Sequence, residues 1–314
     1  MSACLLCGSE RAERVAAQTD RLYGTTAKEF LVIRCSECGF ARLDPMPAPE
    51  ELSSYYPPSY WFAPDGSAAA RLEESYRRLV LRDHVRFVER ALRSSKARGT
   101  LLDIGAGGGL FLGMMKERGF RVAALDFSED AARVAWRQQG VPSVCAMLQN
   151  PPLRPGAFAC ITMFHVLEHL PDPRVYVNAA RDLLAPDGRL VVQVPNAASW
   201  QARLLGKAWN GLDVPRHLFD FRDRDLARLL ESGGFEILRR KYFSLRDNPA
   251  GLASSVAPWL DPMARKIRRH GEGGAARLVK DAAYFALTLG SVPLAALEAA
   301  FGAGATVMME ARAR

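Results

Sequence analysis

Several features that define large classes of protein are scarce in this chain of 314 residues. Met1 to Gly8 lack the basic start and apolar run of a secretory signal. Six cysteines are too few for a disulfide scaffold of this length. No internal repeat and no low-complexity tract interrupts the chain. We therefore expect a globular protein of the cytoplasm, where thiols stay reduced.

Charge of one sign does not dominate either. Lys and Arg total 42 against 34 Asp and Glu, which leaves a net charge of +8. Because acidic residues are interleaved with the arginines, the chain shows no concentrated basic patch of the kind that nucleic-acid-binding proteins carry. Apolar residues make up 49% of the chain, enough for a large core, so extended disorder is excluded.

Short apolar runs alternate with helical patterns after Gly99, which predicts an α/β domain with a mostly parallel sheet covered on both faces. Right-handed crossovers place the loops after the strand ends at one edge, where ligands bind. The expected strands are Thr100–Ile104, Arg121–Asp126, Pro142–Met147, Ala157–Phe164, Arg189–Val194, Phe235–Phe243 and Ala305–Ala311. The expected helices include Leu110–Arg118, Glu129–Gln139, Arg174–Leu184 and Asp223–Ser232.

Two segments precede this domain, which we assign to residues 99–314. Residues 1–44 hold two pairs of cysteines. Residues 45–98 begin with a proline-rich connector, whose proline density predicts turns rather than a helix, and end in a helical pattern from about Ala69 to Ser95. The connector also carries the aromatic cluster Tyr55, Tyr56, Tyr60, Trp61 and Phe62, which we expect to help close a ligand pocket.

A glycine-rich turn follows the first strand of the α/β domain. Asp103, Gly105, Gly107 and Gly109 form the pattern D-x-G-x-G-x-G. Glycine permits positive φ there and lets a ligand approach the backbone closely. The dinucleotide pattern G-x-G-x-x-G fails, because its third glycine falls on Leu110. The turn therefore predicts a cofactor other than NAD.

This turn resembles motif I of the class I methyltransferases, which use S-adenosylmethionine, release S-adenosylhomocysteine and have a Rossmann-like seven-stranded sheet. The resemblance implies that Asp103 and the glycine turn face the methionine part of the cofactor. Asp126 ends the next strand, where an acidic side chain can accept hydrogen bonds from the ribose hydroxyls. The other residues of the implied cofactor site are Ala106, Phe127, Met147, Phe164 and His165.

The resemblance extends over roughly residues 35–245. The segment from Phe164 to Pro173 is similar to the LEHL-x-DP segment of small-molecule methyltransferases, including the ubiquinone-biosynthesis O-methyltransferases. The stretch from Val194 to Leu218 is like one bacterial branch of that group. An acidic residue near the adenine is replaced by the Ala146–Leu148 segment, so we expect backbone groups and apolar packing to recognise the adenine.

His165, Glu168 and His169 also match the H-x-x-E-H pattern of some zinc peptidases. That pattern needs a helix presenting both histidines, whereas this one begins at a strand end. The ubiquinone-type enzymes can place a metal-binding acidic cluster in this segment, so these three residues could bind a divalent ion. We favour packing and helix capping.

The paired cysteines predict a metal site. Cys4 and Cys7, like Cys35 and Cys38, form C-x-x-C-G knuckles in which the glycine lets backbone N–H groups reach the thiolates. Four thiolates in a closed tetrahedron are the structural zinc arrangement, and they leave no open position for catalysis. We therefore expect a structural Zn²⁺ at Cys4, Cys7, Cys35 and Cys38.

The acceptor must be held in line behind the activated methyl group, and a hydroxyl acceptor must also lose a proton. Histidine suits that transfer near neutral pH. The catalytic candidates are His165, His169 and His217, the last beside Arg216 in the loop after the fifth strand of the domain. At position 217 a histidine that only satisfies loop backbone groups is the open alternative.

A helical insertion, about residues 246–304, is expected before the last strand. It contains the basic run from Arg265 to His270 and an uncharged stretch from Ala282 to Leu297, interrupted by Gly290 and Pro293, which falls short of a membrane span. The insertion could form a lid over an apolar acceptor, pack on the sheet or rest on a membrane surface. We favour the lid or the packing role.

These features predict methyl transfer to a small-molecule, glycan-precursor or lipid-precursor acceptor, at oxygen. The alternative is an RNA methyltransferase that uses the zinc module for recognition, although that module is not enriched in Lys or Arg. A scaffolding protein on the same fold is a third hypothesis, which the intact Asp103, glycine turn and Asp126 disfavour. The oligomeric state has no signature in the sequence.

Overall fold

The computed structural model describes residues 3–56, 68–148, 151–268 and 273–314. Its larger sheet has seven strands in the order β10-β11-β8-β7-β4-β5-β6. The five strands β8, β7, β4, β5 and β6 pair in parallel, while β11 runs antiparallel to β8 and β10. The strands are β4 Thr100–Ile104, β5 Val122–Asp126, β6 Ser143–Cys145, β7 Phe158–Phe164, β8 Leu184–Pro195, β10 Phe235–Lys241 and β11 Thr306–Ala313. The prediction of a seven-stranded Rossmann-like sheet is confirmed.

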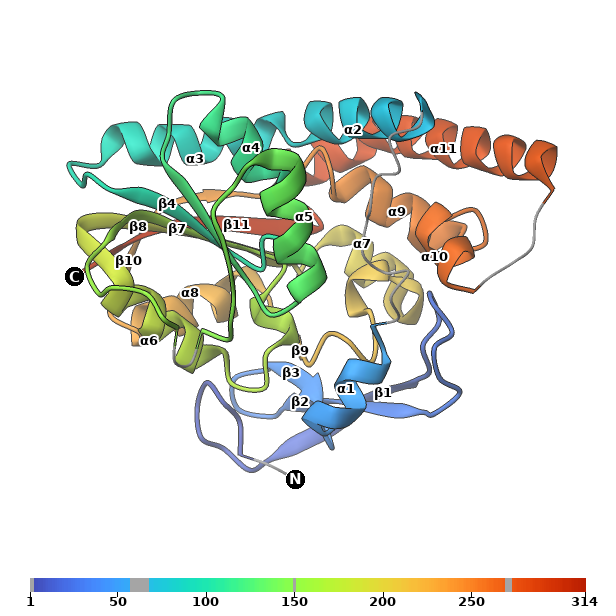
Figure 1. Cartoon of the computed structure of the whole chain (residues 1–314). Coiled ribbons are helices and arrows are strands. Elements are labelled where there is room, and N and C mark those ends of the chain that lie inside the picture. Colours follow the sequence, from blue (N-terminus) through green and yellow to red (C-terminus); the bar gives the residue numbers. More distant parts are fainter. Residues whose placement is uncertain (1–2, 57–67, 149–150, 269–272) are drawn as a thin grey trace.

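Helices cover both faces of this sheet (Figure 1). On one face lie α3 Arg82–Ser94, α4 Leu110–Lys116 and α5 Glu129–Gln139, and on the other α6 Pro173–Leu183 and α8 Asp223–Ser232. The predicted α5 has the observed bounds because both ends are encoded locally. Ser128 accepts a hydrogen bond from the Ala131 N–H, and Gly140 ends the helix in the left-handed region.

A smaller sheet joins the N-terminal segment to the α/β domain. Its order is β1-β2-β3-β9, with β1 Ala12–Gln18, β2 Phe30–Cys35, β3 Ala41–Leu43 and β9 Phe219–Asp220. Strand β9 follows the loop after β8, and it pairs antiparallel with β3. Phe40 stacks on Phe219 with ring centroids 5.4 Å apart. The N-terminal module therefore shares a sheet and a core with the domain that follows it.

Between these units the structure differs in detail from the predictions. A short helix, α1 Pro49–Ser54, lies in the proline-rich connector, because proline is compatible with the first turn of a helix. The expected helix from Ala69 to Ser95 is divided at Leu81 into α2 Ala68–Val80 and α3. Tyr60, Trp61 and Phe62 of the expected aromatic cluster lie outside the described residues.

The insertion before β11 is helical, as expected. It consists of α9 Asn248–Val256, α10 Pro262–Ile267 and α11 Gly274–Ala300. Within the part of the chain that the structure describes, α11 alone is long and apolar enough to cross a membrane by length and composition, and 22% of its most apolar window is buried. The uncharged stretch from Ala282 to Leu297 is part of this longer helix, which runs through Gly290 and Pro293 and includes residues before Ala282. Arg269 and His270 of the basic run are outside the described residues.

The loop after β8 holds short helical turns that approach the N-terminal module. These are α7 Trp200–Leu205, η3 Gly206–Ala208 and η4 Asn210–Leu212, while η2 Leu167–His169 follows β7. The loops after β4, β5, β7 and β8 all leave the carboxyl ends of parallel strands, so they meet at one edge of the large sheet.

Candidate active site and zinc module

The glycine turn after β4 adopts the backbone that its sequence predicts. Gly105, Gly107 and Gly109 have φ of +71°, +52° and +72°, in the left-handed region that favours glycine. A Cβ at Gly105 would lie 2.7 Å from Val166 Cγ2, and one at Gly109 would lie 2.8 Å from Ala135 Cβ. A Cβ at Gly107 would meet nothing within 4 Å. The turn is therefore packed on two sides and open at Gly107, which suits the close approach of a cofactor.

Asp126 holds this turn in place. Its Oδ2 accepts a hydrogen bond from the Gly107 N–H at 2.8 Å, and its Oδ1 accepts one from the Ser128 N–H at 2.9 Å. Because a carboxylate has about four lone-pair sites, these bonds leave capacity for hydroxyl donors such as those of a ribose. Asp126 lies at the end of β5, as the sequence predicts, and it also links β5 to the turn.

Asp103 lies behind the turn, near the end of β4. Its side chain is buried, and Oδ1 accepts a hydrogen bond of 2.6 Å from the Thr162 hydroxyl. Burial raises the pKa of Asp103 to about 7, although the Thr162 bond lowers it. The structure thus places Asp103 as a support beneath the glycine turn, and a direct contact with the cofactor stays a prediction.

The expected adenine region has an apolar surface. Phe127 follows β5 and Met147 follows β6, and their side chains are 62% and 60% exposed. Since β5 and β6 are adjacent strands, in which Asp126 aligns with Cys145, both side chains lie at the same edge of the sheet. Ala106 lies in the turn, and Phe164 packs edge-on against His84 and Phe111 at 5.0 and 5.1 Å. The open turn, Asp126 and this apolar surface fit S-adenosylmethionine.

A cavity of about 330 Å³ lies beside His165. Most of the residues that line it have polar side chains, and we call this space the polar cavity. It is shared by the N-terminal module, the loop after β8 and the insertion. Its polar side chains include Tyr23, Gln201, Asn210, Asp213, Asp247, Ser254, Asp261 and Tyr284, together with His165, His169 and His217.

His165 is held between two carboxylates. Its Nδ1 lies 3.0 Å from Glu168 Oε1, its Nε2 lies 3.4 Å from Asp247 Oδ2, and its backbone has a φ of +58°. Burial by itself lowers the pKa of His165, but Asp247 and Glu168 raise it to about 9. A pKa of about 9 favours the imidazolium at neutral pH, and an imidazolium cannot accept a proton. Of the three predicted bases, His165 is the least suited to that role.

His169 and His217 face each other with ring centroids 4.6 Å apart. The Nδ1 of His169 lies 3.0 Å from the Arg216 carbonyl oxygen, and that of His217 lies 2.8 Å from the Gly211 carbonyl oxygen. Because a carbonyl only accepts, we assign the proton of each ring to Nδ1, which leaves both Nε2 atoms as acceptors. Burial and the neighbouring His217 lower the pKa of His169 to about 4, so His169 is neutral at pH 7.

Glu168 completes a group of potential metal ligands. One oxygen of Glu168 and one nitrogen each of His169 and His217 lie within 4.8 Å of one another. Glu168 is fully buried, and its Oε2 has no hydrogen-bond partner. The sequence pattern pointed to His165 as the third ligand, but His165 instead pairs with Asp247, while His217 reaches the group from a loop 48 residues further along.

The N-terminal module forms one wall of the polar cavity. Leu22 and Tyr23 line the cavity, and Asp20 just before them is buried. Arg216 donates to both Asp20 oxygens at 3.0 and 2.9 Å and to Asp213 at 2.6 Å. Burial by itself raises the pKa of Asp20, but Arg216 lowers it to about 2. The pair therefore stays ionised and joins the module to the loop that carries His217.

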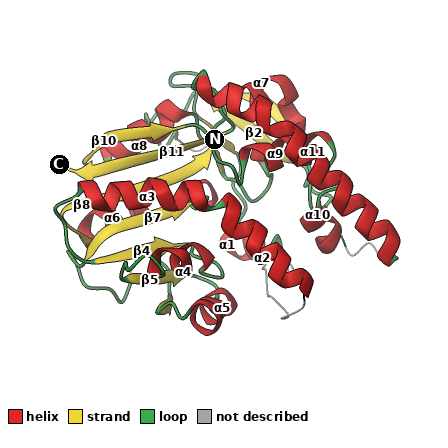
Figure 2. Ribbon diagram, turned by 90° about the horizontal axis from the view of Figure 1, so that it is seen from above, coloured by secondary structure: helices red, strands yellow, loops and turns green. Residues whose placement is uncertain are grey.

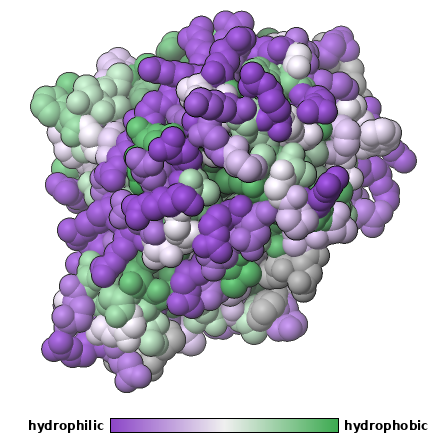
Figure 3. All heavy atoms as spheres, turned by 90° about the vertical axis from the view of Figure 1, so that its left-hand side faces the viewer, coloured by the Kyte–Doolittle hydropathy of each residue, from purple (hydrophilic) through white to green (hydrophobic). Residues whose placement is uncertain are grey.

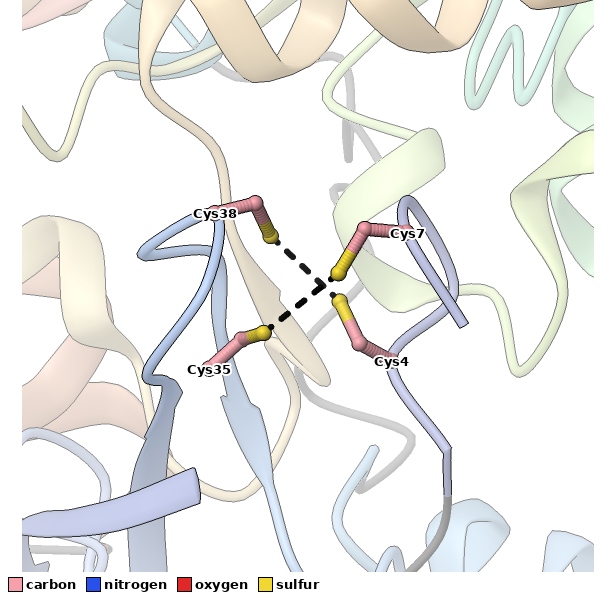
Figure 4. A group of neighbouring side chains, drawn as sticks. All are labelled: Cys4, Cys7, Cys35 and Cys38. Atoms are coloured by element: carbon pink, nitrogen blue, oxygen red, sulfur yellow. Dashed lines mark hydrogen bonds between the residues drawn. The ribbon is translucent and has the colours of Figure 1, made fainter. Parts of the chain in front are cut away.

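The four predicted zinc ligands come together at the outer end of this module (Figure 4). Cys4 Sγ lies 3.5 Å from Cys38 Sγ, and Cys7 Sγ lies 3.5 Å from Cys35 Sγ. Zn–S bonds of about 2.3 Å in a tetrahedron require sulfurs about 3.8 Å apart, so the spacing fits zinc closely. Burial by itself raises the pKa of Cys35, but backbone N–H groups of Cys38 and Glu37 lower it to about 6. Burial raises the pKa of Cys38 to about 12, so of these two thiols Cys35 is the one that favours the thiolate before a metal binds.

Several residues of the polar cavity had no signal in the sequence. Tyr23, Asp247 and Tyr284 lie in segments without a motif, and they reach the cavity from distant parts of the chain. Arg216 and Asp213 do belong to the D-V-P-R-H-L stretch, which marked the loop but not its partner Asp20. The ion pair between Asp20 and Arg216 is apparent only in the folded structure, because the two residues lie far apart in the sequence.

Comparison with known proteins agrees with this geometry. Residues 73–240 match the family described as "Methyltransferase domain". Ubiquinone biosynthesis O-methyltransferase of Xanthomonas euvesicatoria is 28% identical over 163 residues, which cover 46% of this chain and 66% of that protein. The enzyme of the same name from Idiomarina loihiensis is 28% identical over 149 residues, 43% of this chain and 61% of that protein. The chain thus matches less than two thirds of either relative.

Solved structures are similar to a large part of the chain at low sequence identity. A methyltransferase dependent on S-adenosylmethionine (SAM) from Archaeoglobus fulgidus is 17% identical, with a TM-score of 0.49 over 78% of this chain and 100% of that one. Geranyl diphosphate C-methyltransferase of Streptomyces coelicolor is 14% identical, with a TM-score of 0.49 over 80% of this chain and 86% of that one.

The family match covers more than half of the chain and includes the glycine turn, Asp126 and the loop with His165 and His169. The strand order, the open turn at Gly107 and the carboxylate at the end of β5 agree with what the resemblance to class I methyltransferases implies. The chain belongs to the class I S-adenosylmethionine-dependent methyltransferase family.

Proposed function

We propose that this protein transfers a methyl group from S-adenosylmethionine to a hydroxyl oxygen of a small polar molecule held in the polar cavity. The observation that carries the proposal is the polar lining of that cavity, into which two histidines with free Nε2 atoms face. The relatives named as O-methyltransferases support oxygen as the accepting atom.

The cofactor would occupy the open side of the glycine turn. Gly107 leaves room for it, Asp126 would accept from its ribose hydroxyls, and Phe127 with Met147 would cover its adenine. When bound, the cofactor supplies an activated methyl group. His165 directly follows β7 and lines the polar cavity, so it adjoins both the proposed cofactor site at the strand ends and the proposed acceptor site in the cavity.

The cavity selects the kind of acceptor. Its volume of about 330 Å³ lies near the lower end of the range for small-molecule sites, roughly 300–1,000 Å³. Gln201 lines the cavity, and its buried Oε1 has no hydrogen-bond partner within the described residues, so an apolar ligand would leave it unpaired, which costs free energy. We therefore infer an acceptor with several hydroxyl groups, as in a sugar or a phenolic precursor, in place of the apolar acceptor that the insertion suggested.

His217 is the base that we propose. The raised pKa of His165 favours its protonated form at neutral pH, and a pKa of about 4 makes His169 a weak base. His217 lines the cavity, and the Gly211 carbonyl fixes its proton on Nδ1. Its Nε2 would accept the proton of the acceptor hydroxyl as the oxygen gains the methyl group. Asp213 Oδ2, 3.9 Å from that Nε2, would stabilise the resulting imidazolium.

The cysteine cluster would hold a structural Zn²⁺. The sulfur spacing and the depressed pKa of Cys35 support this assignment. All four ligand positions are filled by protein, so we assign the ion no part in the chemistry. Its role would be to hold the module that carries Asp20, Leu22 and Tyr23 against the cavity.

The first test of the function follows the methyl group. Purified protein is incubated with methyl-tritiated S-adenosylmethionine and an extract of the source organism lacking this gene, and the label is traced into RNA, lipid and polar small-molecule fractions. We expect label in the polar fraction, which can then be identified by mass spectrometry. Label in RNA would overturn the proposal in favour of RNA methylation, and label confined to the lipid fraction would contradict the polar acceptor.

The base is tested in the same assay. His217→Gln keeps a polar side chain but removes the basic nitrogen, so we expect kcat to fall about 100-fold or more while the Kd for S-adenosylhomocysteine is unchanged. His169→Gln is the matched variant on the facing ring, and we expect a smaller loss of kcat. An equal loss in both variants would contradict the assignment of His217.

A further inference from the structure

Helix α11 presents its polar side chains to the protein and its apolar side chains to solvent. The buried residues of α11 are Thr288, Ser291, Ala295 and Glu298, three of them polar, and Gln201 donates to Glu298 at 2.9 Å. These residues recur every three or four positions, so they form one stripe of the helix. A helix at the surface of a soluble monomer has the opposite arrangement.

The outward stripe of α11 is uniformly apolar. Its large side chains are between 42% and 71% exposed: Leu278, Val279, Phe285, Leu289, Leu294, Leu297 and, just beyond the helix end, Phe301. Three small residues four positions apart, Ala282, Ala286 and Gly290, run along its centre and are exposed. No charged residue lies on this stripe, because Arg277, Lys280 and Asp281 belong to the other side of the helix by their spacing.

Helix α2 extends this surface. Leu72, Tyr76 and Leu79 lie on one side of α2 at helical spacing and are 73%, 37% and 48% exposed. Tyr76 contacts Phe285 edge-on, with ring centroids 6.0 Å apart, and the two helices run roughly parallel to each other (Figure 2). We call the outward stripe of α11 with these three residues of α2 the α11 face.

The α11 face concentrates the exposed apolar surface of the molecule. It holds ten of the nineteen large apolar side chains that are exposed among the described residues. At the other end of the molecule, hydrophilic side chains predominate and apolar ones are scattered (Figure 3). If each large side chain adds about 100 Å², the face measures on the order of 1,000 Å², whereas the largest patch on a typical monomer measures roughly 300–600 Å².

We propose that the α11 face is the interface of a homodimer, in which α11 packs against α11 of a second copy. The area matches the roughly 800 Å² that each partner buries in a stable complex. The small residues along its centre would let two helix backbones approach closely, with the larger side chains interlocking on either side. A face without charged residues is typical of a permanent interface between identical chains.

A lipid bilayer is the competing occupant, and the charges disfavour it. Helices that lie on a membrane carry Lys and Arg beside their apolar stripe. Here charges of both signs lie near the face: α2 carries Arg71, Arg77 and Arg78 with Glu73 and Glu74, and Arg265 and Arg277 of the insertion share Asp281. Anionic lipid would therefore gain little electrostatic attraction from this face.

The dimer would also support the polar cavity. Tyr284 points from the inner side of α11 into that cavity, where its hydroxyl lies 2.9 Å from Ser254 Oγ. Ser254 donates to Asp261, and Arg265 pairs with Asp281, so α9, α10 and α11 form one bonded wall. A second copy packed on the outside of α11 would hold this wall in place.

The decisive measurement is the mass of the full chain in solution by light scattering and analytical ultracentrifugation at micromolar concentration. We expect twice the chain mass of 34.5 kDa. Leu289→Arg and, in a separate variant, Leu278→Arg put a charge on the face at positions that are 62% and 71% exposed, so both should fold and sediment as monomers. Circular dichroism and S-adenosylhomocysteine binding confirm the fold of each variant.

Val175→Arg is the matched control. Val175 is an exposed aliphatic residue on α6, away from α11, and this variant should remain a dimer. A monomeric wild type, or a dimer that survives both variants on the face, would overturn the proposal. In the first case, flotation with phosphatidylglycerol vesicles shows whether lipid covers the face instead.

Discussion

The two halves of the candidate site are built in different ways. The cofactor half, meaning the glycine turn with Asp126, Phe127 and Met147, lies within one stretch of the chain that begins at β4 and ends just after β6. The polar cavity takes side chains from the N-terminal module, the loop after β8 and the insertion. One half is therefore encoded locally, and the other depends on how distant segments dock.

This difference suggests how the protein can change its acceptor without losing its cofactor. The cofactor half is tied to the large sheet, whose strands and crossovers hold it rigidly. The walls of the polar cavity rest on a few long-range contacts, of which the buried pair Asp20–Arg216 is the most enclosed. Changes in the cavity walls should therefore alter acceptor binding while cofactor binding persists.

The largest effect is expected at Gly105. In Gly105→Ala the new Cβ would lie 2.7 Å from Val166 in a backbone with φ of +71°, so the turn must shift. We expect the affinity for S-adenosylhomocysteine to fall by about 100-fold or more by calorimetry, because a displaced turn loses several cofactor contacts at once. Gly119→Ala is the control: it has φ of +85° but no atom within 4 Å of the Cβ. Similar losses in both would show that strain alone is responsible.

Disruption of the four-cysteine cluster should affect acceptor binding and cofactor binding differently. Cys35→Ser breaks the four-thiolate site, which should loosen the wall formed by Leu22 and Tyr23. We expect KM for the acceptor to rise roughly tenfold while the Kd for S-adenosylhomocysteine changes by less than about twofold. Cys145→Ser, at an exposed cysteine outside the cluster, should change neither. Equal loss of both affinities would mean that the module supports the whole fold.

A moderate effect is expected from Asp20→Asn. The change leaves the buried Arg216 with Asp213 as its one remaining carboxylate, so it should lower the free energy of unfolding by about 2 kcal/mol, less than complete loss of a buried partner. Urea denaturation measures the change, with Asp130→Asn on the exposed surface of α5 as the control. A loss below about 0.5 kcal/mol would place the pair among ordinary surface ion pairs.

The smallest perturbation is a titration that changes no residue. The histidines of the site should titrate on opposite sides of neutrality, with the pKa of His165 about 9 and that of His169 about 4. Because the folded pKa of His165 lies above its unfolded value of about 6.5, its stabilisation is present below pH 6.5 and is lost as the pH rises through about 9. Nitrogen chemical shifts of the imidazole rings measure both values. A neutral His165 at pH 7 would restore it as a candidate base.

Much of the cofactor half could be read directly from the sequence. The glycine turn follows β4, Asp126 ends β5, and α5 has the predicted bounds, because a capping serine, a terminal glycine and positive φ are local properties. The paired cysteines likewise come together as their spacing predicts. The differences from the predictions fell where tertiary contacts dominate: Leu81 divides a predicted helix, and α11 runs through Gly290 and Pro293.

The polar cavity could not be predicted in the same way. The three histidines were candidates, but their different roles depend on neighbours such as Asp247 and the carbonyls of Gly211 and Arg216. Asp247 lies 82 residues from His165, and Asp20 lies 196 residues from Arg216. No periodicity or spacing links residues so far apart.

The sequence by itself determined the class of fold, the cofactor turn and the cysteine cluster, because backbone conformation and ligand spacing act over a few residues. Only the tertiary structure decided which histidine is charged, which carboxylate holds Arg216, and that the polar side of α11 faces inward. Burial, charge pairing and the solvent-facing side of a helix are properties of the packed chain, and they arise only when distant segments meet.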